Sequence, residues 1–192
     1  MGCGRTGRRG RFEPPTQGVS AWTFVDRDLR RRPQACAEAA ALPTAAAVFD
    51  TVVCLEVLEY VWAPSNALDE FAGVLQPCET LILSTPFLRR VDTPDDYRRF
   101  TEPALRRLLA ETGFEVEACL PQGHALTSSV NILRHVVAVQ SRWVRRAPSI
   151  LLRPLFGGLL WAETPQQQRY PELKSFSTGY LVVARRPAGR AS

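Results

Sequence analysis

The chain has 192 residues, of which 45% are hydrophobic and 22% are charged, and its formal net charge is +5. This length gives room for one ordinary domain, and this composition excludes a polar, disordered chain. Lys174 is the only lysine, so the positive charge is almost entirely arginine; because the arginines are not interleaved with stacking aromatic residues, a nucleic-acid-binding module is disfavoured.

The cysteines and the apolar segments indicate the compartment. Five cysteines are scattered along the chain without a CxxC pair, which is typical of reduced thiols, so we expect a cytoplasmic protein. No apolar stretch follows the first arginines, so we expect no secretory signal. The apolar run at residues 150–161 is interrupted by Arg153 and Pro154, and it is shorter than the roughly 20 residues that span a bilayer.

Five segments rich in apolar and β-branched residues predict strands. The first, residues 22–26, ends in a carboxylate, and residues 30–47 predict an irregular connection. Residues 49–55 are nearly continuously apolar, as expected for a strand covered on both faces of a parallel sheet. The later predicted strands are residues 80–84, 114–120 and 179–184.

A first amphipathic segment after residue 55 predicts a helix. Ser65 is the expected N-cap, and Pro77 is expected to end the helix. Its apolar face consists of Ala67, Leu68, Phe71, Val74 and Leu75.

A second amphipathic segment begins after Thr101, which we expect to cap a helix with Pro103 in its first turn. Gly113 stands where a left-handed C-terminal cap is wanted. The apolar face of this helix consists of Leu105, Leu108 and Leu109. Since strands alternate with amphipathic helices, the pattern predicts an open α/β sheet.

Several short segments carry a resemblance to a known family. Residues 2–4 (Gly-Cys-Gly) resemble a glycine loop after a first strand. Residues 25–26 (Val-Asp) resemble the acidic end of a second strand. Residues 38–43 with the following Phe-Asp at 49–50 are similar to an acidic-Ala-x-x-Leu-Pro segment, and residues 53–61 to a fourth strand and its exit. Further matches follow at residues 75–77, 85–87, 96–101 and 112–114. In this order, the segments resemble the class I, Rossmann-like S-adenosylmethionine-dependent methyltransferases of the small-molecule, type 11-like family.

The resemblance implies a mostly parallel Rossmann-like sheet with helices on both faces, and S-adenosylmethionine as cofactor. Asp26, with Asp28 as its rival, would accept the ribose hydroxyl hydrogens. The glycines would leave room for the amino acid end of the cofactor, and Glu38 with Ala39 would lie over the adenine edge. The cofactor-binding residues implied by the resemblance are Gly2, Cys3, Gly4, Asp26, Glu38, Ala39, Leu55 and Glu56.

The chain departs from the family pattern in three places. It starts inside the glycine loop, so we expect the first central strand to be missing and the chain to be truncated at its N-terminus. Cys78 and Glu79 stand where the family has a Gly-Gly turn, which predicts a strained turn. Tyr60 stands where the family usually has histidine, and we expect this change to alter the side of the site that faces the methyl acceptor.

The expected reaction is methyl transfer to a small acceptor, hydrophobic or lipid-like. Positioning alone can accelerate such an in-line displacement, so the absence of an obvious triad or metal cluster is no objection, and no metal is expected. For a hydroxyl acceptor the candidate bases are Asp95, Tyr97 and His124, although packing or surface roles also explain each. The alternative is a catalytically inactive Rossmann-like remnant that acts as a binding or scaffold protein.

We expect a single domain of residues 1–192, with a cofactor-binding core at 1–124, a helical insert at 125–178, a final strand at 179–186 and a tail at 187–192. Within the insert, residues 131–143 predict a helix. The insert has three interpretations: a lid over the acceptor, peripheral contact with a membrane surface through residues 142–161, or helices packed on the sheet or at a dimer contact.

Overall fold

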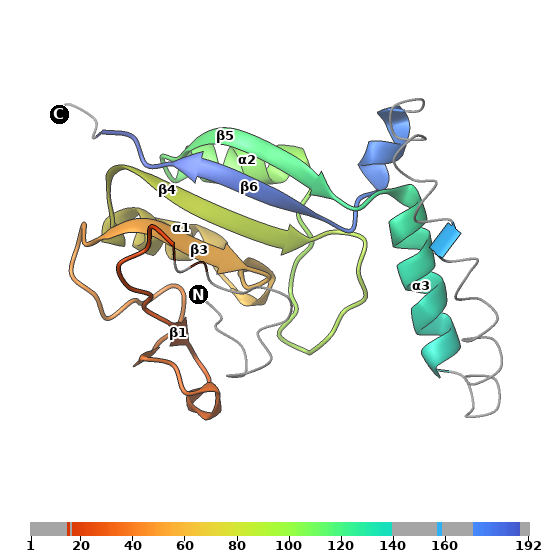
Figure 1. The fold of residues 1–192 in the computed structure, drawn as a ribbon, viewed down its shortest axis with the longest axis horizontal. Coiled ribbons are helices and arrows are strands. Elements are labelled where there is room, and N and C mark those ends of the chain that lie inside the picture. The colour runs from red at the N-terminus through yellow and green to blue at the C-terminus, as the bar shows by residue number, and fades with distance from the viewer. Residues whose placement is uncertain (1–14, 16, 140–156, 159–170, 189–192) are drawn as a thin grey trace.

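The computed structural model describes residues 15, 17–139, 157–158 and 171–188, and its largest element is a four-stranded sheet (Figure 1). The strands lie in the order β3 (Phe49–Leu55), β4 (Leu75–Pro86), β6 (Gly179–Arg185) and β5 (Glu115–Gln122). β3 pairs parallel with β4, whereas β6 pairs antiparallel with both β4 and β5. Three strands therefore point the same way, and the predicted α/β class with a mostly parallel sheet is confirmed.

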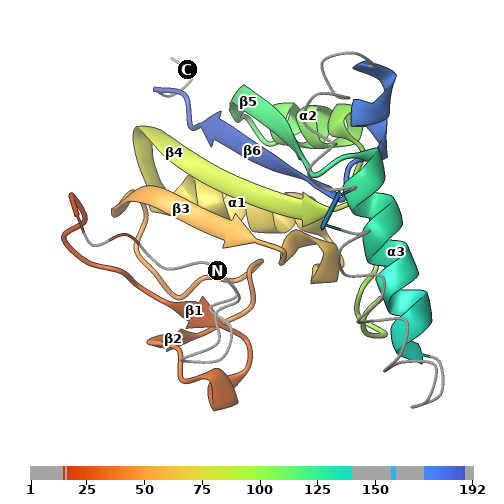
Figure 2. The same cartoon turned by 45° about the vertical axis from the view of Figure 1, so that its right-hand side comes forward.

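A second, two-stranded sheet lies beside β3 (Figure 2). It consists of the parallel strands β1 (Val25–Asp26) and β2 (Ala35–Cys36), which are joined through the short helix η1 (Leu29–Arg31). In the part of the chain that the structure describes, no strand bonds this sheet to β3. β2 was not predicted, because two residues carry no periodic signal.

Two helices, α1 (Pro64–Val74) and α2 (Glu102–Glu111), lie behind the same face of the large sheet in Figures 1 and 2. The described residues thus place both on one face, although the resemblance implied helices on both. The predicted apolar face of α1 is buried throughout. The prediction of Ser65 as N-cap was wrong: Ala63 occupies that position, because Pro64, with its fixed φ, starts the helix two residues earlier.

The helix α2 follows its sequence signals closely. Thr101 is the N-cap, and its Oγ1 accepts a hydrogen bond from the Ala104 N–H at 3.4 Å. Gly113 has a φ of +85°, as expected for a left-handed C-terminal cap. Leu105 and Leu109 are buried against the sheet. The core therefore lies between the two helices and the sheet.

The strand β4 is longer than the predicted residues 80–84 and contains both Pro77 and Pro86. Its pairing with β6 carries it to Pro86, and at its other end Leu75 pairs with Phe49 of β3. The predicted strain near its start is present: Cys78 has a φ of +66°, a region that favours glycine, and its N–H donates to the carbonyl of Arg186 at 2.9 Å.

The helix α3 (Ala125–Val139) stands at the end of the sheet, beyond the carboxyl ends of β4 and β5 (Figures 1 and 2). The predicted helix at 131–143 therefore begins earlier, at Ala125. A short helix η3 (Pro171–Phe176) leads back to β6. The expected membrane contact through 142–161 lies outside the described residues, apart from 157–158. Within the described ranges, none of the helices has the length and apolar character needed to cross a bilayer.

Candidate functional site

The predicted crevice residue Glu56 lies directly after β3 and is held firmly in place. Its backbone has a φ of +53°, and its N–H donates to the carbonyl of Ser84 at 3.0 Å. One carboxylate oxygen accepts from the Ser84 hydroxyl at 3.3 Å, and the other pairs with Arg89 Nη1 at 2.6 Å. The preceding Leu55 is in register with Ser84. A carboxylate is thus fixed at the carboxyl edge of the sheet, where open α/β sheets bind ligands.

Asp26 ends β1 and is buried, with only 6% of its surface exposed. Its Oδ1 accepts from the Asp28 N–H at 3.0 Å, and Arg31 Nε lies 3.8 Å from the same oxygen. The rival Asp28 instead caps η1 and binds the backbone and guanidinium of Arg30, which lowers the pKa of Asp28 to about 2. The Asp28 side chain is thus engaged by Arg30, whereas the Asp26 side chain is engaged by the Asp28 N–H and lies near Arg31.

Arg27 connects the end of β1 with the loop that follows β4. Its Nη2 lies 2.9 Å from Asp95 Oδ2, and the hydroxyl of Tyr97 donates to Asp95 Oδ1 at 3.3 Å. The hydrogen bond to Asp95 and the nearby charge of Glu38 raise the pKa of Arg27. The structure therefore brings together two of the predicted bases, Asp95 and Tyr97, and the predicted adenine-side residue Glu38, around an arginine that sequence reasoning missed.

The two candidate bases of this loop differ in what they can do chemically. Desolvation, followed by the charge of Asp95, raises the pKa of the Tyr97 phenol. The phenol therefore stays protonated at neutral pH and acts as a hydrogen-bond donor. Asp95 accepts hydrogen bonds from both Arg27 and Tyr97.

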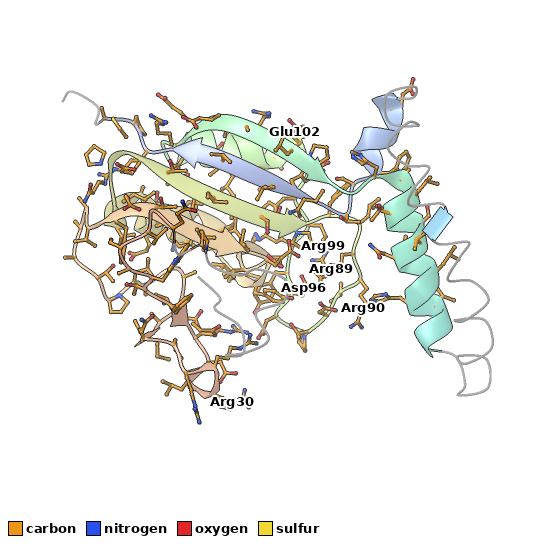
Figure 3. The ribbon with its side chains drawn as sticks, viewed as in Figure 1. Arg30, Arg89, Arg90, Asp96, Arg99 and Glu102 are labelled. Carbon is orange, nitrogen blue, oxygen red and sulfur yellow. The ribbon has the colours of Figure 1, made fainter. Side chains whose placement is uncertain are left out.

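The loop at residues 87–101 contains a partly buried ion pair between Asp96 and Arg99. The guanidinium binds both carboxylate oxygens, with Nη2 at 2.7 Å from Oδ2. Arg99 also donates to the carbonyls of Arg89 and Arg90. Figure 3 shows these four side chains gathered between the end of β4 and α3. The hydrogen bonds to Arg99 lower the pKa of Asp96, so the pair stays charged and fixes the loop.

Glu59 is a further buried carboxyl that sequence reasoning missed. It lies in the short helix η2 (Leu58–Tyr60), is 1% exposed, and its Oε2 has no hydrogen-bond partner among the described residues. Burial raises its pKa to about 8, and the charges of Glu56 and Asp96 act in the same direction. Its carbonyl accepts from the Tyr97 N–H at 3.0 Å. A second glutamate within the apolar segment 53–61 was the signal that could have identified it.

The remaining predicted residues are spread more widely. His124 precedes α3, and its Nδ1 is buried without a hydrogen-bond partner; within the described ranges no hydrogen bond joins it to Asp95 or Tyr97. Ala39 is buried in the core while Glu38 is exposed. The glycine loop at residues 2–4 lies outside the described residues. Among the residues that the structure describes, no group of three or more His, Cys, Asp or Glu could hold a metal ion.

Comparisons with known sequences match part of the chain to methyltransferases. Residues 20–83 match the family model described as a methyltransferase domain. A Mycolicibacterium smegmatis protein, whose name describes an S-adenosylmethionine-dependent methyltransferase, is 32% identical over 115 residues, which cover 56% of this chain and 45% of that protein. The chain therefore spans less than half the length of this relative.

Solved structures resemble the chain at low sequence identity. The [4+2]-cyclase SpnF is 19% identical with a TM-score of 0.47, and the match covers 81% of this chain and 56% of SpnF. An O-methyltransferase from the trans-AT PKS multienzyme of Brevibacillus brevis, solved with S-adenosyl-L-homocysteine, is 12% identical with a TM-score of 0.46. That match covers 79% of this chain and 48% of the other.

Proposed function

We propose that this chain, a class I methyltransferase relative whose residues 20–83 belong to the methyltransferase-domain family, binds S-adenosylmethionine and transfers its methyl group to a small acceptor. The observation that carries the proposal is the ion pair between Arg27 and Asp95. Because Arg27 directly follows Asp26, this pair brings the end of β1 to the loop after β4, at the same edge as Glu56. Two strand-end carboxylates thus flank the break between the sheets, a position typical of ligand sites in open α/β folds.

The residues at this edge suit the chemistry of the cofactor. Asp26 accepts hydrogen bonds from the ribose hydroxyls, since a carboxylate at a strand tip offers two acceptor oxygens. The turn with Glu38 and Ala39 lies at the adenine edge, and Leu55 with Glu56 lines the crevice. Gly2, Cys3 and Gly4 receive the amino acid end. When bound, S-adenosylmethionine supplies a methyl group activated by a sulfonium, and the chain supplies alignment.

Asp95 is our proposed proton acceptor for an acceptor hydroxyl, with Tyr97 as the donor that orients it; His124 is the remaining candidate. An exposed aromatic pair next to these residues favours a hydrophobic or lipid-like acceptor. The Trp62 side chain is 72% exposed and its ring lies 5.2 Å, edge to face, from that of Tyr97. Exposed aromatic surface of this kind is typical of binding sites for apolar molecules.

The helix α3 supports the interpretation of the insert as a lid. It stands beyond the carboxyl edge of the sheet and exposes Ile132, Leu133 and Val136. Lids at such an edge exclude water and select substrates. We also propose that the protein works in a reducing compartment, the cytoplasm, because Cys36, Cys54, Cys78 and Cys119 are free thiols.

Calorimetric titration with S-adenosylhomocysteine tests the proposal. We expect the wild-type chain to bind, and Asp26→Asn and Glu56→Gln each to weaken binding about tenfold or more, because each removes a charged hydrogen-bond acceptor. Asp28→Asn is the matched control, since asparagine keeps the cap of η1, and its affinity should equal that of the wild type. If the folded wild-type chain releases no heat of binding, the proposal fails and the inactive remnant takes its place.

A further inference from the structure

The helix α1 carries one carboxylate that bonds to a distant segment of the chain. Glu70 Oε2 accepts a hydrogen bond from the Leu42 N–H at 2.9 Å. Glu70 stands at the border of the helix, between the buried Phe71 and the exposed Asp69. The backbone of a residue inside a helix is already hydrogen-bonded within the helix, so α1 does not need this side-chain bond in order to form. The contact therefore acts on the segment that contains Leu42.

That segment is the turn at residues 38–41 and the residues after it. The turn is closed by the hydrogen bond from the Ala41 N–H to the Glu38 carbonyl at 3.1 Å. Ala39 is 5% exposed and belongs to the core, and Ala40 and Leu42 pack against it. Apolar contact thus fixes the inner side of the turn, while the Glu38 side chain stays exposed.

The same helix also fixes the chain farther on. The N–H groups of Ala47 and Val48 donate to the carbonyls of Gly73 and Val74, each at 2.9 Å. Between Leu42 and Val48 the chain is therefore attached to α1 at both ends. Within the described residues no strand hydrogen-bonds the small sheet to the large one. The contacts to α1 consequently set where this turn lies relative to β3.

We infer that Glu70 is a positioning residue for adenine recognition: it holds the turn that presents Glu38 and whose inner side is packed into the core through Ala39. This inference rests on the proposed function. A hydrogen bond to a charged group is stronger than one between neutral groups. Loss of the bond lets the turn shift. The binding affinity should therefore fall most for ligands whose purine ring is recognised by this turn.

The test compares the affinities of S-adenosylhomocysteine and S-inosylhomocysteine, which differ only in the purine ring, by calorimetry. We expect the wild type to prefer the adenine compound and Glu70→Ala to lose about tenfold in affinity for it, with a smaller loss for the inosine compound. Glu70→Gln keeps an acceptor oxygen and should recover most of the preference. Asp69→Ala, the neighbouring exposed carboxylate of α1, should equal the wild type.

Glu70→Asp keeps the charge but is one methylene too short to reach Leu42, so it should behave as Glu70→Ala and serves if the alanine variant does not fold. The melting temperature of each variant identifies a loss caused by unfolding. Equal purine preference in the wild type, Glu70→Ala and Glu70→Asp would overturn the inference and leave the proposed function intact. No binding of either compound by the wild type would overturn both.

Discussion

Arg27 and Asp95 are 68 residues apart in the sequence, yet their side chains form a 2.9 Å ion pair that joins the end of β1 to the loop after β4. Both side chains are about half exposed, at 49% and 47%. Exposed pairs of this kind contribute little to stability, because water screens them and ordering two long side chains costs entropy. The pair aligns the two segments more than it stabilises them.

We therefore expect Arg27→Ala and Asp95→Ala each to lower the free energy of unfolding by less than about 1 kcal/mol. Urea unfolding of both variants and of the double variant gives the coupling energy, which should shrink further at high salt. A coupling energy above about 2 kcal/mol would instead mean that this pair holds the small sheet onto the large one.

Cys78 provides a second prediction, because it occupies a left-handed conformation with a φ of +66° where the family has glycine. Such a conformation costs a non-glycine residue about 1–2 kcal/mol, and the greater freedom of glycine in the unfolded chain offsets about 0.5–1 kcal/mol of the gain. Cys78→Gly should therefore raise the free energy of unfolding by about 0.5–1 kcal/mol. Cys78→Ala keeps the strain and is the control in the same denaturation experiment; equal stabilities would contradict the argument.

The sequence predicted those elements whose residues repeat with a clear period. The bounds of β3 agree with its continuous apolar run at 49–55, and the apolar face of α1 is buried as expected. The place of β6 between β4 and β5 was not predictable, because strand order is decided by long-range pairing that leaves no local pattern.

The candidate site likewise contains residues that could be predicted from the sequence and residues that could not. Asp26 and Glu56 were proposed from the family resemblance, as carboxylates at the ends of apolar strands. Arg27 and Arg89 were not, because a surface arginine acquires a role only through a partner brought near by the fold. Glu59 is the intermediate case: a carboxyl inside an apolar segment is visible in the sequence, whereas its burial is not.

Two glycines with opposite surroundings give a third prediction. A Cβ on Gly179 would lie 2.4 Å from the backbone oxygen of Thr85, where β6 pairs with β4, and backbone cannot give way easily. Gly73 is in α1, and outside the backbone of that helix no atom of the described residues lies within 4 Å of its Cβ position.

Gly73→Ala should therefore stabilise the protein by about 0.5–1 kcal/mol, the usual helix preference for alanine. Gly179→Ala should destabilise it by about 1–3 kcal/mol, as overpacking does. Thermal unfolding of the two variants, which make the same chemical change, should shift the melting temperature in opposite directions. Shifts of the same sign would show that the close approach at Gly179 relaxes.

The buried carboxyl of Glu59 makes the stability depend on pH. Burial raises its pKa in the folded chain to about 8, from an ordinary value of 4.5, with Glu56 and Asp96 adding to the shift and Arg89 opposing it. Between these two values the folded chain holds a proton that the unfolded chain releases. Its contribution to stability is thus fully present below the lower value and is lost as the pH rises through the higher one, by at most about 1.4 kcal/mol per pH unit.

Glu59→Gln replaces this carboxyl with a neutral amide of the same shape, so the variant should gain stability relative to the wild type as the pH rises from about 5 to 8. Urea unfolding at each pH measures the difference in free energy of unfolding between the variant and the wild type. The other titratable groups are the same in both proteins, so their contributions cancel. Asp69→Asn, at an exposed position of α1, should follow the wild-type curve throughout. Parallel curves for Glu59→Gln and the wild type would mean that Glu59 titrates with an ordinary pKa, and that it ionises at neutral pH despite its burial.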